Sequence, residues 1–324
     1  MGPIKLLLYL LYIYYAFNDQ KMENLRKEIN IVVDLFKSGA FSKAESIAKK
    51  LININPRVVF LYNLLGLILA EQNKIEEAIK CYEQGIKINP NFGMIYNNIG
   101  LLYFKRGISD DIKKAENLYK KAISLDNKIP EPHNNLGSLY DHLNKIDDAI
   151  NCFMKALVIN PKFSYAHHNL GSAYVSIGRF NLAEKHFQES IRLNPNFSIT
   201  HRSLSRITKY SDDNAHFSDL KKIYKHTNKN ETNKKIEIGF ALGKAYEDIK
   251  NFEKSYFHYN EANFIKRKKI YYSSKLEKDR FNEIKKTYNK KLFDKNKNSI
   301  NTDYSPIFIV GMPRSCTTLA EQIL

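Results

Sequence analysis

The chain has 324 residues, enough for two or three domains, and its hydrophobic content of 43% is typical of globular proteins. Its formal charge of +17 points to anionic partners, such as nucleic acid, a membrane surface, or a nucleotide cofactor with an acidic substrate; lysine-rich solvated faces are the simpler alternative. The three cysteines, an odd number set far apart, argue against a disulfide framework and favour a reducing, cytoplasmic location, and no metal site is expected because the nine histidines form no ligand cluster.

An apolar run of leucine, isoleucine and tyrosine occupies residues 4–17 and is interrupted by Lys5. The run is short for a membrane span, and no small-residue cleavage site follows it as in a signal peptide. A membrane anchor is one interpretation. We favour another, in which Met22 is the true start of translation, or the run is a helix that caps the array after it. Residues 1–21 are therefore expected to be an extension.

From about Leu25 onward the sequence repeats itself. Pro56 and Pro90 are 34 residues apart, and so are Pro161 and Pro195. Each period carries an aromatic residue or histidine, then Leu-Gly or Ile-Gly, an aromatic residue or leucine, an alanine and another aromatic residue. These marks are Tyr62, Leu65-Gly66, Leu69, Ala78 and Tyr82; Tyr96, Ile99-Gly100, Tyr103, Ala115 and Tyr119; His133, Leu136-Gly137, Tyr140, Ala149 and Phe153; and His167, Leu170-Gly171, Tyr174, Ala183 and Phe187.

The period and its marks closely resemble tetratricopeptide repeats, which are helix-turn-helix units. The resemblance implies an all-α superhelical solenoid of five repeats in residues 22–197, with a protein or peptide as the partner. Small residues let the two helices of a hairpin approach, aromatic residues fill the space toward the next hairpin, and Cys81 and Cys152 are expected in the core. A weaker first unit carries Ile31, Leu35, Ala44 and Pro56. Three extra residues near 107–111 are expected in the surface turn of the third unit.

Asparagine recurs directly before the Leu-Gly or equivalent position, outside the packing marks. A row of amides could hold an extended peptide through its backbone, because an amide both donates and accepts hydrogen bonds. The row resembles the asparagine ladder of O-GlcNAc transferase. The alternative is that the amides bond neighbouring helices to each other. The candidate peptide-binding residues are Asn30, Asn98, Asn135 and Asn169.

After Phe197 the repeat degenerates, because Ser205 replaces the glycine and a polar stretch follows at 211–235. We expect a helix and a loop there, and one more hairpin at 236–269, where the marks return. Residues 239–267 also resemble the segment before the catalytic domain of bacterial repeat-sulfotransferase fusions.

The rest of the segment 198–302 is basic, with 13 Lys or Arg against five Asp or Glu between Glu261 and Ile300. Interleaved aromatic residues make a nucleic-acid arm conceivable. We favour a basic amphipathic linker helix whose aromatic residues pack on the array, and expect no specific nucleic acid.

The pattern of residues 303–324 predicts a strand, a tight loop and the start of a helix. Residues 307–310 are apolar and mostly β-branched, as in a buried parallel strand, and Gly311 ends them. Loop amides and a helix N-terminus then converge, which favours phosphate binding. The glycine and lysine of the nucleoside-triphosphate loop are missing.

The loop resembles the 5′-phosphosulfate loop Pro-Arg-Ser-Gly-Thr-Thr of sulfotransferases, above all the bacterial tyrosylprotein-sulfotransferase-like enzymes. It matches at five of six positions and departs at Cys316, where a Cβ would crowd the anion. A reactive thiol at Cys316 is an alternative. The resemblance implies 3′-phosphoadenosine 5′-phosphosulfate as donor and an α/β domain of which this chain holds the first part. The residues implied to bind the donor are Arg314, Ser315, Cys316, Thr317 and Thr318, with Arg314 also stabilising transition-state charge.

Two functions follow from these patterns. In the first, the repeats recruit a protein or peptide acceptor for sulfuryl transfer to a tyrosine-like hydroxyl, and the chain is the front part of the enzyme. In the second, the chain is an inactive protein-interaction scaffold with a sulfotransferase remnant, because the family's general base and 3′-phosphate groups lie beyond Leu324.

Overall fold

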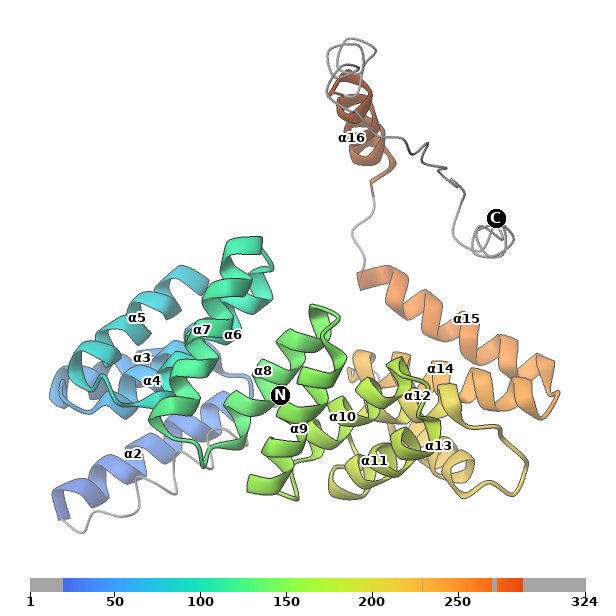
Figure 1. Cartoon of the computed structure of the whole chain (residues 1–324), viewed down its shortest axis with the longest axis horizontal. Helices are drawn as coiled ribbons and strands as arrows, with labels where there is room; N and C mark the ends of the chain where they lie inside the picture. Colours follow the sequence, from blue (N-terminus) through green and yellow to red (C-terminus); the bar gives the residue numbers. More distant parts are fainter. Residues whose placement is uncertain (1–19, 229, 270–272, 288–324) are drawn as a thin grey trace, which may run out of the picture. The chain divides into compact units, whose positions relative to one another are not determined.

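The computed structural model describes residues 20–228, 230–269 and 273–287, and every regular element in this part of the chain is an α-helix (Figure 1). The chain divides into two compact units, one up to Lys266 and one from Arg267 onward. The first unit is a series of helical hairpins. Its helices are α2 (Gln20–Lys37), α3 (Phe41–Ile54), α4 (Val59–Glu71), α5 (Ile75–Ile88), α6 (Gly93–Arg106), α7 (Ser109–Leu125), α8 (Pro130–His142), α9 (Ile146–Ile159), α10 (Ser164–Ser176), α11 (Phe180–Leu193), α12 (Ser198–Ile207), α13 (Ala215–His226), α14 (Thr232–Asp248) and α15 (Phe252–Lys269).

A glycine in the first helix of a hairpin faces an aromatic ring in the second. A Cβ added at Gly66 would lie 2.3 Å from a ring carbon of Tyr82, and one at Gly137 would lie 2.6 Å from Phe153. The same contact joins Gly100 to Tyr119, Gly171 to Phe187 and Gly243 to Tyr259. The glycine is therefore needed for close approach of the ring, since real Cβ atoms do not come this near. The pair in α14 and α15 confirms that the packing marks return after the degenerate repeat.

In the first hairpin, other residues replace the glycine and the aromatic ring at this contact. Val32 and Ala48 are fully buried at the positions that glycine and the aromatic residue hold in later hairpins. A larger side chain on α2 and a smaller one on α3 keep the core filled. Ile31, one of the residues that mark this unit in the sequence, is 53% exposed, and its neighbours face the core instead.

The three extra residues of the third unit lengthen a helix instead of the turn. α7 has 17 residues, against 14 in α5, α9 and α11. The turn before α7 ends the preceding helix at Gly107, whose φ of +72° favours glycine. The prediction of an enlarged turn was therefore wrong, and the insertion is absorbed as helix.

In four repeats, the recurring aromatic residue or histidine near the start of the first helix donates a hydrogen bond to the proline carbonyl six residues earlier. The donor and acceptor atoms are 2.9–3.1 Å apart in four repeats. This bond fixes the loop that enters the helix, which explains why either tyrosine or histidine can occupy this position. The pairs are Tyr62 with Pro56, Tyr96 with Pro90, His167 with Pro161, and His201 with Pro195. As expected, Cys81 and Cys152 are buried free thiols.

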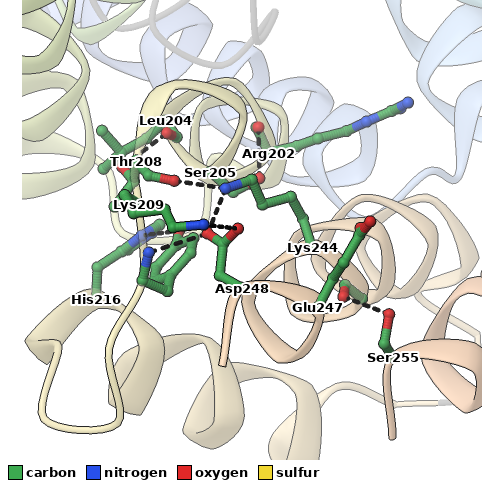
Figure 2. Close-up of polar contacts among 12 residues, drawn as sticks. Arg202, Leu204, Ser205, Thr208, Lys209, His216, Lys244, Glu247, Asp248 and Ser255 are labelled. Atoms are coloured by element: carbon green, nitrogen blue, oxygen red, sulfur yellow. Dashed lines mark hydrogen bonds and ion pairs between the residues drawn. The ribbon is translucent and has the colours of Figure 1, made fainter. Parts of the chain in front are cut away.

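A cluster around Asp248 ties the degenerate repeat to the hairpin after it (Figure 2). The Asp248 carboxylate accepts hydrogen bonds from Lys244 and from the Tyr210 backbone N–H at 2.9 Å, and Lys244 also donates to the Thr208 carbonyl at 2.7 Å. Burial raises the pKa of Asp248, but the hydrogen bonds from Lys244 and Tyr210 outweigh it and hold the pKa below its ordinary value. The extended turn after α12 is thereby anchored to α14.

The second unit contains α16 (Ser274–Thr287), the helix predicted from the basic segment. Its apolar residues Leu276, Phe281 and Ile284 are exposed within this unit, and the packing of the segment on the array stays a prediction. The predicted strand at 307–310 lies outside the described residues, as does the apolar run at 4–17.

Candidate peptide-binding groove

A groove with a cavity of about 380 Å³ is formed mainly by the first helices of four successive hairpins. We call it the central groove. Its volume lies near the lower end of the range for ligand-binding sites, roughly 300–1,000 Å³. It is lined by Leu101, Phe104 and Lys105 of α6, Tyr119 of α7, Asn134, Asn135 and Ser138 of α8, Tyr165, His168 and Asn169 of α10, and Phe197 and Ile199 at α12.

The walls of the central groove are aromatic and aliphatic. The rings of Tyr165 and Phe197 lie 4.6 Å apart between centroids, and the ring of His168 lies 5.1 Å from that of Phe197. On the other side, Phe104 makes an edge contact with His142. Ile199 remains 44% exposed, so apolar surface is available to a ligand.

A continuous chain of side-chain amides, which we call the amide relay, starts in the floor of the groove and continues beyond it; Asn134, Asn135 and Asn169 are its members that line the groove. Each amide nitrogen donates to the oxygen of the next amide, at 2.8–3.5 Å. The relay crosses four helices and ends in an amide nitrogen that is buried with no hydrogen-bond partner among the described residues. Its members, in order of donation, are Asn169, Asn134, Asn135, Asn97, Asn98 and Asn63.

Three of the four predicted asparagines belong to the relay, and Asn135 and Asn169 also line the groove. Asn30, on α2, has no place in it. The bonds between helices that formed the alternative interpretation therefore exist for Asn98, Asn135 and Asn169, and their peptide-binding role stays a prediction. Sequence reasoning missed Asn63, Asn97 and Asn134, although the doublets Asn97-Asn98 and Asn134-Asn135 were a visible signal.

The groove is nearly uncharged apart from one cation. Lys105 is exposed at the rim, and none of the described lining residues is acidic. Burial lowers the pKa of His168 from 6.5 to about 4, so its imidazole is neutral at pH 7. The surface therefore suits an apolar segment with polar backbone groups and, at the rim, a negative charge.

A second cavity, of about 420 Å³, lies beside the first between α10, α11 and α12. It combines the apolar side chains Val175 and Phe187 with hydroxyls such as Ser172 and Ser203, and Arg206 lies at its edge. This cavity adjoins the degenerate repeat.

The predicted donor-binding residues Arg314, Ser315, Cys316, Thr317 and Thr318 lie outside the described residues. Across residues 20–228, 230–269 and 273–287, the structure holds no group of three His, Cys, Asp or Glu side chains that could bind a metal ion. Within those same ranges, no helix has the length and apolar character needed to cross a bilayer.

Comparison with known proteins supports the assignment of the repeats as tetratricopeptide repeats. A model of the tetratricopeptide repeat matches residues 130–163 and 164–197, and a TPR repeat model matches residues 66–107. The ycf37 protein of Pyropia yezoensis is 38% identical over 66 residues, which cover 20% of this chain and 35% of that protein. The photosystem I assembly protein Ycf3 of Prochlorococcus marinus (strain NATL1A) is 32% identical over 113 residues, covering 33% of this chain and 64% of that protein. The chain thus spans less than two thirds of either relative.

Among solved structures, a thermophilic TPR protein of Thermus thermophilus superposes with a TM-score of 0.50 at 16% identity. The match covers 56% of this chain and 97% of that one. Identity this low shows a shared fold. The period, the contact between glycine and aromatic ring, and the family models agree, so residues 66–107 and 130–197 carry tetratricopeptide repeats, within an array that is helical throughout the described residues.

Proposed function

We propose that this chain is a protein-interaction scaffold that holds an extended segment of a partner protein in the central groove. The observation that carries the proposal is the union of apolar walls and an amide floor in one cavity, built from four successive repeats. Apolar walls bind side chains, and the Asn169 amide oxygen, which accepts no hydrogen bond among the described residues, is available to a peptide N–H. The curated relative Ycf3 is an assembly protein by name, which supports an interaction role. The buried free thiols fit the reducing location predicted from the sequence.

The first test is a charge placed in the groove wall. Ile199→Asp is expected to weaken binding of any peptide held in the groove at least about tenfold, because a carboxylate would be desolvated against apolar surface. Peptides are first selected from a random dodecapeptide display library on the whole chain, and their affinities are measured by fluorescence anisotropy. Ile108→Asp is the matched control, since Ile108 is 57% exposed and lies outside the groove. Equal affinities in both variants would contradict the proposal.

The sulfotransferase motif supports a second function for the same chain. The match of Pro313, Arg314, Ser315, Thr317 and Thr318 to the 5′-phosphosulfate loop makes the repeats an acceptor-recruiting part of a sulfuryl-transfer enzyme. In that case 3′-phosphoadenosine 5′-phosphosulfate is the donor and a tyrosine-like hydroxyl the acceptor.

Calorimetry with 3′-phosphoadenosine 5′-phosphate tests this second function. A chain extended by about one domain from the natural gene is expected to give heat that Arg314→Ala removes. If the extended chain gives no heat, or heat that Arg314→Ala leaves unchanged, the sulfotransferase function is wrong.

A further inference from the structure

Tyr119 differs in its hydrogen bonding from the residues at the equivalent position of the neighbouring repeats. Tyr119 is fully buried, lines the central groove, and its hydroxyl has no hydrogen-bond partner among the described residues. Tyr82 holds the same place one repeat earlier; burial raises the pKa of Tyr82, and a hydrogen bond to Asn98 opposes that rise. In the next two repeats the place is taken by Phe153 and Phe187, which carry no hydroxyl. Tyr119 thus keeps a donor that the packing does not use.

An unused buried hydroxyl is costly, since it has lost water and gained no partner. The amides nearest in the groove are already engaged with each other: Asn135 donates to Asn97 and accepts from Asn134. A partner for the hydroxyl can instead arrive with a ligand on the groove side of the ring. The hydroxyl would donate, so the group it needs is an acceptor such as a peptide carbonyl.

His168, in the same groove, offers the complementary group, a hydrogen-bond acceptor. Ser190 donates its hydroxyl hydrogen to the Ser164 carbonyl at 2.8 Å, so it accepts from Thr200 at 3.4 Å. The Thr200 hydrogen is then already used, and His168 Nδ1 must be the donor across the 3.0 Å contact to Thr200. Nε2 of His168 is left as a bare acceptor, with no hydrogen-bond partner in the described part of the chain.

We propose that the Tyr119 hydroxyl and His168 Nε2 select the partner of the central groove by binding a carbonyl and an N–H of its backbone. The bound segment is an extended peptide with a large apolar side chain between Phe104 and Tyr165. An acidic residue beside that side chain faces Lys105, the one charged side chain among the described lining residues. This inference rests on the proposed function of the groove. It adds the Tyr119 hydroxyl as the donor and His168 Nε2 as the acceptor that bind the peptide backbone.

Tyr119→Phe tests the donor, because it removes one oxygen and keeps the ring. The probes are fluorescein-labelled dodecapeptides from the display selection whose binding depends on Ile199. Their affinity is expected to fall about fivefold in Tyr119→Phe, while the urea midpoint of the free protein stays level or rises. Tyr96→Phe is the matched control, since the Tyr96 hydroxyl bonds the Pro90 carbonyl outside the groove, and it should leave the affinity unchanged.

N-methylation of the peptide tests the acceptor. Methylating one particular backbone N–H should weaken binding to the wild type about fivefold and should cost much less in His168→Phe, where no acceptor remains. The contrary result is a set of peptides that depend on Ile199 and still bind wild type and Tyr119→Phe with the same affinity. That result would overturn the inference but would not contradict the proposed function of the groove. Self-association of the chain that Tyr119→Phe weakens would assign the groove to a second copy and would also overturn it.

Discussion

Replacing Phe153 by alanine is expected to lower the free energy of unfolding by about 3–5 kcal/mol. The ring is 1% exposed and packs with Ala149, Leu170 and Ala173, so it joins the hairpin of α8 and α9 to the hairpin that follows. Each repeat of a solenoid contacts only its neighbours, so the loss falls on one interface. Urea unfolding, with hydrogen exchange followed helix by helix, should show α8 to α11 losing protection first.

Two variants control this result. Phe252→Ala removes a ring that is 66% exposed and should change the free energy of unfolding by less than about 0.5 kcal/mol. Gly137→Ala should be strongly destabilising in the wild type, because its Cβ would lie 2.6 Å from the Phe153 ring, and clearly less so in the Phe153→Ala background, where the Cys152 Cβ at 3.1 Å is the neighbour that remains. Additive effects of the two substitutions would mean that the contact between ring and glycine does not set the packing.

Acid is expected to unfold the array before pH 4. Burial lowers the pKa of both His168 and His216 from 6.5 to about 4, so the unfolded chain binds protons in this range that the folded chain does not. The stability that they contribute is complete above pH 6.5 and is lost as the pH falls toward 4. A fall of this size corresponds to about 3 kcal/mol for each histidine, against a typical total of about 5–15 kcal/mol.

Hydrogen bonds add to burial at one of these sites, where His216 pairs with His201. His201 uses one ring nitrogen on the Pro195 carbonyl, accepts from His216 with the other at 2.9 Å, and His216 accepts from the Tyr210 hydroxyl at 2.8 Å. A proton added to Nδ1 of His201 would face the N–H of His216, whereas Nδ1 of His216 faces a hydroxyl that can turn to accept, so for His216 it is burial that lowers the pKa.

Urea unfolding at steps of pH between 7 and 4.5 measures the effect. The double variant His168→Gln/His216→Gln should depend less steeply on pH than the wild type, whereas His226→Gln, on an exposed histidine, should follow the wild-type curve. A wild-type free energy of unfolding that is constant over this range would contradict the assignment of these imidazoles as neutral.

The repeat unit was predictable because its packing is local. Gly137 and Phe153 are set 16 residues apart within one hairpin, so the period of glycine, alanine and aromatic residues carries the contact directly. The extension of α7 was not predictable, because Asp110 and Asp111 form a helical first turn as readily as a loop.

The groove was harder to predict from the sequence, because its hydrogen bonds join side chains of different repeats. Asn98, Asn135 and Asn169 could be picked out by position, but the bond from Asn135 to Asn97 spans 38 residues and depends on how two helices cross. The missing partner of Tyr119 is harder still. A tyrosine at this position looks the same in sequence whether its hydroxyl is bonded, as in Tyr82, or not.

The amide relay also implies a gradient of stiffness along the array. It cross-braces α4, α6, α8 and α10, and stops where Arg202 and Ser203 take the asparagine positions in α12. Beyond the relay, α10 and α12 are joined instead by the hydrogen bond between His168 and Thr200 and by the contact between Tyr165 and Phe197. We therefore expect this joint, at one end of the central groove, to be the more compliant one and to adjust the width of the groove to the bound segment.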